Sequence, residues 1–82
     1  MSSVLRIHGT VSRDGNPVEA AYVNLIDPHG LFVAERRTGP DGGYSFHTTP
    51  GKWTLEFLTS GTDKVAREVE GEGELALDVD LS

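Results

Sequence analysis

Apolar and polar residues alternate along most of the chain, and this period of two predicts β-strands rather than helices. Residues 4–12 show the pattern first, because every second position is apolar or glycine: Leu5, Ile7, Gly9 and Val11. The positions between them are polar or charged: Arg6, His8 and Thr10. A half-buried strand exposes one face only, so we expect the first set in the core and the second set on the surface.

Residues 38–57 carry the most informative pattern in the chain. A turn rich in Gly, Pro and Asp at 38–43 precedes a strand in which Tyr44 and Phe46 share one face. After a Pro-Gly turn, a second strand places three bulky side chains on one face: Trp53, Leu55 and Phe57. Cross-strand pairs of this type stabilise a sheet by about 0.2–1 kcal/mol each, so we expect these residues to form the core of a hairpin.

Turn-forming residues separate the other strands of the first half. An Asp-Gly turn at residues 13–17 leads into a short segment, 17–21, whose proline is typical of an edge or a bulge. Residues 22–27 form the next strand, and their alternation does not decide which face is buried. The turn 27–30 precedes a further strand at 31–38.

The last third of the chain predicts two more strands. A loop at residues 60–63 precedes a weaker strand at 65–70 and a tight turn at 71–74. Residues 75–81 then show the clearest amphipathic alternation of all, with four apolar residues at every second position: Leu75, Leu77, Val79 and Leu81. Six or seven strands with a turn every eight to ten residues predict an antiparallel sandwich or barrel.

The composition limits what kind of protein this is. Eighty-two residues form one domain, 1–82, without room for a second core. The absence of cysteine excludes disulfides, a thiolate nucleophile and a cysteine-based zinc site. No apolar run approaches the roughly 20 residues of a membrane span, and the start of the chain does not resemble a signal peptide. We therefore expect a cytoplasmic protein without contact to a membrane.

The net charge of −6 is concentrated in the last third. Residues 63–82 carry seven acidic residues and only two basic ones, Lys64 and Arg67. An acidic surface repels phosphate groups, which argues against nucleic acid and anionic lipid as partners. The simplest interpretation of this acidic segment is a solubilising face.

Several spaced motifs together resemble the carboxypeptidase regulatory-like domain. They are Ile7-x-Gly9-x-Val11-x-x-Asp14-Gly15-x-Pro17-Val18, Ala21-x-Val23-x-Leu25, Thr38-x-x-Asp41-Gly42-x-Tyr44-x-Phe46 and Pro50-Gly51-x-Trp53-Thr54-Leu55. The resemblance covers roughly residues 5–58 and implies a prealbumin-like fold. We therefore expect an all-β protein, a seven-stranded antiparallel Greek-key β-sandwich.

Within that superfamily, the chain most resembles a small actinobacterial family of unknown function. The likeness rests on Gly9 to Val18, on Val-x-Leu-x-Asp at 23–27 and on Phe-x-Ala-Glu at 32–35. Genes of that family often lie beside rhodanese-type thiosulfate sulfurtransferases, so the resemblance implies a link to sulfur metabolism. Its members typically begin with a short cysteine-containing extension, whereas this chain has no cysteine, which argues against a direct sulfur-carrying role.

The candidate chemistry is sparse. His8, His29 and His47 have no His-x-His or His-x-x-x-His spacing, so exposed histidines are favoured over a metal site. Asp-Gly pairs occur in turns because they suit the backbone conformation, more often than because the aspartate binds calcium, so a calcium site is not favoured. Prealbumin-type 5-hydroxyisourate hydrolases carry a C-terminal Tyr-Arg-Gly-Ser signature, and this chain ends differently. We therefore expect no cofactor and no enzymatic activity.

A protein partner remains the best functional hypothesis. Arg6, Arg36, Arg37 and His47 are the candidate contact residues, with Arg36 and Arg37 expected beside Arg6 on an outer face. The same arginines are alternatively expected to form weak surface ion pairs with the acidic C-terminal strand.

We expect a non-catalytic accessory or interaction module whose partner is a rhodanese-type sulfurtransferase. The alternatives are a structural module of a secreted or cell-surface assembly and, third, a small-molecule enzyme of prealbumin type. Asp78 and Asp80 are expected to discourage edge-to-edge pairing, which predicts a monomer or weak homodimer.

Overall fold

The computed structural model describes residues 4–59 and 64–81, and the loop predicted at residues 60–63 lies outside them. The described part contains nine β-strands and no helix, hence no helix that could cross a membrane. In chain order the strands are β1 (Leu5–Arg13), β2 (Asn16–Pro17), β3 (Tyr22–Ile26), β4 (Phe32–Arg37), β5 (Gly43–Thr48), β6 (Gly51–Leu58), β7 (Val65–Gly71), β8 (Gly73–Ala76) and β9 (Val79–Asp80). The prediction of an all-β fold is confirmed.

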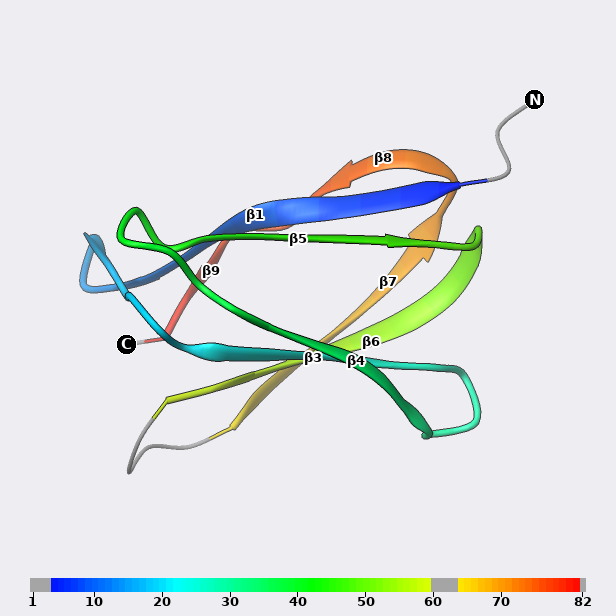
Figure 1. Cartoon of the computed structure of the whole chain (residues 1–82), viewed down its shortest axis with the longest axis horizontal. Coiled ribbons are helices and arrows are strands. Elements are labelled where there is room, and N and C mark those ends of the chain that lie inside the picture. Colours follow the sequence, from blue (N-terminus) through cyan, green and yellow to red (C-terminus); the bar gives the residue numbers. More distant parts are fainter. Residues whose placement is uncertain (1–3, 60–63, 82) are drawn as a thin grey trace.

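The strands form two sheets that face each other as a sandwich (Figure 1). In one sheet, here called the β1 sheet, β5 pairs antiparallel with one side of β1 and β8 pairs parallel with its other side. The two-residue strands β2 and β9 pair with the C-terminal end of β1. The other sheet, here called the β3 sheet, has the order β4-β3-β6-β7, and all its pairings are antiparallel.

The core between the sheets consists mainly of alternate apolar positions of the strands. Its members are Leu5, Ile7, Val11, Ala21, Val23, Leu25, Tyr44, Phe46, Leu55, Phe57 and Val79. The face of β3 that alternation left undecided is settled by Val23 and Leu25, which are 0% and 2% exposed. Trp53 shares the inward face of β6 but stays only partly buried, and its Nε1 donates a hydrogen bond to the carbonyl of Thr49 at 2.9 Å.

The Asp-Gly turn after β1 adopts the geometry that its sequence favours. Asp14 and Gly15 have φ values of 53° and 82°, and positive φ at both central residues is the mark of a type I′ hairpin turn. Asp80 holds this turn in place, because its carboxylate accepts hydrogen bonds from the backbone N–H groups of Asp14 and Gly15 at 3.3 and 3.2 Å.

The C-terminal segment differs from the prediction in two ways. Residues 75–81 do not form one strand, since β8 ends at Ala76 and β9 begins at Val79. Both strands run parallel to β1, so a wholly antiparallel sandwich is wrong and the β1 sheet is mixed. The chain reaches this position by crossing from the β3 sheet to the β1 sheet between β7 and β8 (Figure 1).

Candidate functional site

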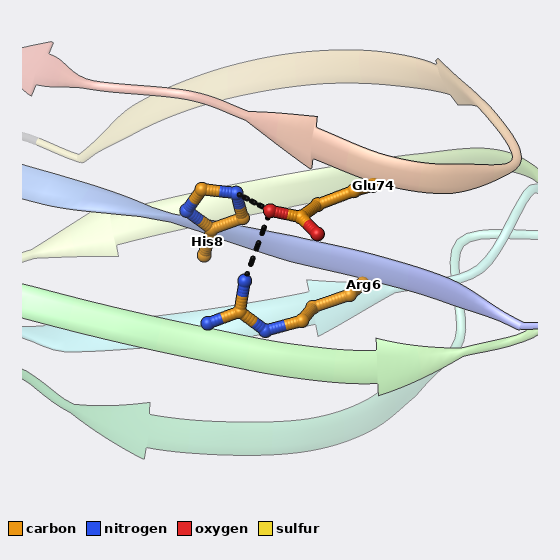
Figure 2. A network of polar contacts seen from close by, with 3 residues as sticks. All are labelled: Arg6, His8 and Glu74. Carbon is orange, nitrogen blue, oxygen red and sulfur yellow. Dashed lines mark hydrogen bonds and ion pairs between the residues drawn. The ribbon is translucent and has the colours of Figure 1, made fainter.

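A charged network covers part of the outer face of the β1 sheet. The parallel register places Glu74 of β8 opposite Arg6 of β1, and His8 lies two residues further on the same face of β1. One carboxylate oxygen of Glu74, Oε1, lies 3.3 Å from Arg6 Nη1 and 3.0 Å from His8 Nε2 (Figure 2). The side chains are substantially exposed, so solvent screens the network and each contact stabilises the fold by at most about 1 kcal/mol.

The predicted contact residue His47 belongs to the same face. It is exposed on β5, directly opposite Arg6 in the antiparallel register of β1 and β5. The structure thus brings together two of the four predicted contact residues and adds His8 and Glu74 to them. Within residues 4–59 and 64–81, no group of three or more His, Cys, Asp or Glu side chains is arranged to hold a metal ion.

Arg36 and Arg37 lie elsewhere, on strand β4 at the edge of the β3 sheet. The Arg36 guanidinium is 5.4 Å from the ring centroid of Phe46, a core residue of β5, and Arg36 also donates a hydrogen bond to the Glu35 carbonyl at 3.0 Å. The Arg37 guanidinium lies 4.8 Å from the ring centroid of Tyr22. The expectation that both arginines sit beside Arg6 is wrong because they belong to the β3 sheet. Arg36 contacts an aromatic ring of the β1 sheet, and Arg37 contacts one of its own sheet.

The acidic residues of the C-terminal segment bind β1. Asp78 Oδ1 accepts hydrogen bonds from the backbone N–H and the hydroxyl of Thr10, at 2.9 and 3.1 Å. Asp80 accepts a hydrogen bond from the Ser12 hydroxyl at 3.3 Å in addition to those from the turn. These carboxylates therefore attach the parallel strands to β1.

Tyr44 is a titratable group near the core, and its role is structural. Its hydroxyl donates a hydrogen bond to the Leu77 carbonyl at 2.6 Å. Burial raises the pKa of Tyr44 well above its ordinary value, and the negative charge of Asp78 raises this pKa further. The phenol therefore stays protonated at neutral pH and acts as a fixed hydrogen-bond donor.

Sequence reasoning missed an exposed apolar segment at the start of β4, formed by Leu31 and the first two residues of the strand. Leu31, Phe32 and Val33 are 63%, 60% and 50% exposed. Strand β4 pairs with β3 on one side only, so these residues lie at an open edge of the sheet. The available signal was the run of three consecutive apolar residues, which breaks the alternation that buries one face of a strand.

A groove of about 610 Å³ adjoins this segment. It opens between the β3–β4 turn, the beginning of β6 and the end of β7. Its apolar lining consists of Ile26, Pro28, Trp53 and Val69, and its charged lining consists of Asp27, Lys52, Glu68 and Glu70. Apolar walls with a few charged groups are typical of ligand and peptide sites.

Comparison with solved structures shows a widely shared fold. The dioxygenase domain of a dioxygenase carbohydrate-binding protein fusion from Streptomyces sp. SirexAA-E superposes with a TM-score of 0.79 at 13% identity, covering 99% of this chain and 80% of that one. The Bacillus anthracis TIE protein gives a TM-score of 0.75 at 20% identity, covering 95% of this chain and 17% of that much longer one. Identities this low establish similarity of fold alone.

Sequence comparison identifies nearer relatives. The uncharacterized protein Rv0814c of Mycobacterium tuberculosis is 33% identical over 73 residues, which cover 88% of this chain and 73% of the relative. The sequence model of the DUF1416 family, described as proteins of unknown function, matches residues 2–82. The chain therefore belongs to the DUF1416 family.

Proposed function

We propose that this protein is a non-catalytic β-sandwich module that binds another protein, with a rhodanese-type thiosulfate sulfurtransferase as its partner. The partner is chosen from the gene neighbourhood of the actinobacterial family that the sequence resembles. We place both proteins in the cytoplasm and the module itself in a monomeric or weakly dimeric state.

The observation that carries this proposal is the exposed apolar segment at the open edge of the β3 sheet. Leu31 and Phe32 are each at least 60% exposed, next to Val33 at 50%. Burying one such side chain contributes about 1.5–3 kcal/mol, and micromolar binding needs about 8 kcal/mol in total. Three neighbouring side chains can therefore supply a large share of the affinity for a partner.

The finer assignment of the fold is also proposed. Strands β8 and β9 both pair with β1 and can be counted as one interrupted strand, and β2 has only two residues. Counted in this way, the described chain has seven main strands, which supports the prealbumin type of sandwich. The parallel pairing of the last strand with β1 is part of this assignment.

The alternative is a structural module of a larger, secreted or surface-exposed assembly. It is favoured by one observation, that a sandwich of this fold occupies only 17% of the Bacillus anthracis chain. A full-length gene that encodes further domains beside this sandwich favours the alternative over the accessory module.

Titration calorimetry with the purified sulfurtransferase of the same host tests the proposal. We expect saturable binding that is at least tenfold weaker for the double variant Leu31→Ser/Phe32→Ser, since each serine removes apolar surface from the contact. Val4→Ser is the matched control, because Val4 is an apolar residue that is 45% exposed just before β1. Absence of binding by the wild-type protein eliminates the sulfurtransferase as partner.

A further inference from the structure

The groove that Trp53 helps to line lies next to the apolar segment at the start of β4. We propose that it receives a basic segment of the partner protein, with a lysine or arginine side chain placed beside the carboxylates of Glu68 and Glu70. This inference rests on the proposed function and specifies the chemistry of the surface that the module recognises.

The groove exists because two paired strands end at different points. Strand β3 ends at Ile26, which pairs with Thr54 of β6, whereas β6 begins three residues earlier, at Gly51. Over these three residues β6 still pairs with β7, but its other side has no β3 residue opposite it. The turn that follows β3 forms the facing wall, through Asp27, Pro28 and Gly30.

The charges of the groove favour a cationic occupant. Three carboxylates line it against a single ammonium group, that of Lys52. Glu70 lies opposite Lys52 in the β6–β7 register and Glu68 lies opposite Thr54, yet within residues 4–59 and 64–81 neither glutamate forms an ion pair. Both carboxylates are therefore available to a ligand.

Asp27 is the third carboxylate, and its position is fixed. Its Oδ1 atom accepts hydrogen bonds from the backbone N–H groups of His29 and Leu31, both at 2.9 Å. A negative charge held in this way needs no reordering when a cation approaches, and the entropic cost of binding is correspondingly lower.

The apolar part of the lining fits the stem of a lysine or arginine. These side chains lay their methylene groups along apolar surfaces while the charged end reaches polar groups. Ile26 pairs with Thr54, and Thr54 pairs with Glu68, so this apolar side chain lies on the same face of the β3 sheet as the glutamate. An apolar side chain beside carboxylates therefore matches both halves of such a residue.

The neighbouring surface indicates what flanks the basic residue. Ile26 lines the groove and also pairs with Phe32 of β4, and Gly30 of the groove directly precedes the apolar segment. One extended segment can therefore place a basic side chain in the groove and an apolar one on Phe32. We assign to the occupant a sequence in which basic and apolar residues are neighbours.

Fluorescence of Trp53 offers a direct assay, since it is the only tryptophan of the chain. The probes are two capped octapeptides, one of alternating leucine and arginine and one with glutamate in place of arginine. We expect a saturable change of emission with the basic peptide that weakens as salt is added, and none with the acidic peptide.

Charge-neutralised variants locate the binding. Glu68→Gln/Glu70→Gln should weaken binding of the basic peptide about tenfold, because it removes the two free carboxylates. Glu19→Gln/Glu72→Gln changes the net charge equally at positions outside the groove and should stay within about twofold of the wild type. The inference is overturned if both double variants weaken binding equally, or if both peptides give the same response. It is also overturned if the emission of the protein alone changes with its concentration, because this signals a second copy as the occupant.

The same variants separate this inference from the proposed function. If the sulfurtransferase binds the wild type and Glu68→Gln/Glu70→Gln equally well, the groove is not the contact and only the inference is lost. If the basic peptide binds as expected while the sulfurtransferase does not, the groove stands and the choice of partner is wrong.

Discussion

Gly9 lies directly against the carbonyl group of Leu77. A Cβ atom at position 9 would come within 1.8 Å of Leu77 O, a distance that no side chain can adopt. The same carbonyl accepts the hydrogen bond of Tyr44. Strand β1, strand β5 and the break between β8 and β9 therefore meet at one point, and only a residue without a side chain fits there.

Gly9→Ala should destabilise the fold by about 3 kcal/mol or more, because the backbone of residues 77–78 has to move. Urea unfolding followed by circular dichroism measures this loss. Gly71→Ala is the matched control, since its Cβ would meet only Leu75 Cδ1 at an ordinary 3.5 Å. Equal stabilities of the two variants contradict the account of the Gly9–Leu77 contact.

Tyr44→Phe should cost about 1–2 kcal/mol at pH 7, since it leaves the Leu77 carbonyl without the donor that it has in the wild type. The ring stays in the core, 5.5 Å from the ring of Phe57, so packing is retained. Urea unfolding at pH 7 measures the difference. A variant as stable as the wild type shows that the hydrogen bond contributes nothing.

The raised pKa of Tyr44 also predicts a loss of stability in alkali. The folded state keeps the phenol protonated, while the unfolded chain releases its proton at the ordinary pKa of 10.0. Stability from this group is complete below that pH and is lost as the pH rises above it, at up to about 1.4 kcal/mol per pH unit. Unfolding free energies from pH 9 to 11 should fall more steeply for the wild type than for Tyr44→Phe, and parallel curves contradict the prediction.

The sequence predicted the strands well and their connections poorly. Leu5, Ile7 and Val11 are all 0% exposed, as their alternation in β1 indicates, because burial of one sheet face leaves a local pattern. The break at residues 77–78 leaves no such pattern. It depends on contact with Gly9, which is 68 residues away, and alternation alone does not separate parallel from antiparallel pairing.

For the candidate surfaces, the sequence predicted which side chains are exposed but not which of them are neighbours. Arg6 and His47 share a face because alternation places both outside, and only the register of β1 and β5 makes them neighbours. Arg36 also has a charged side chain, yet its position on β4 turns it toward the ring of Phe46. Charge predicts exposure on average but does not predict a cation–π contact at a sheet edge.

Glu74→Gln should lower the free energy of unfolding by less than about 1 kcal/mol, although two basic side chains contact one oxygen atom. The Glu74 side chain is 64% exposed, so water replaces most of what is lost. A double-mutant cycle with Arg6→Gln isolates the pair, and urea unfolding supplies the four free energies. A coupling energy above about 2 kcal/mol contradicts the assignment of a weak surface network.

A β-bulge in the exposed edge strand offers a physical reason for the proposed monomeric or weakly dimeric state. Leu25 pairs with Ala34 and Ile26 with Phe32, so Val33 is an extra residue on β4. Bulges twist an edge strand and disrupt the row of backbone groups that a second copy needs for pairing. The apolar segment can then stay exposed for a partner without joining copies of the chain to each other.

If the wild type is the proposed monomer, deletion of Val33 should convert it into a dimer or larger species at micromolar concentration, because the straightened edge of β4 can pair with another copy. Light scattering coupled to size exclusion measures the mass. Val33→Ser is the control: it removes the apolar side chain, keeps the residue count of the bulge and should remain monomeric. If the wild type is already a stable tetramer, or if the deletion leaves the mass unchanged, the bulge does not protect this edge.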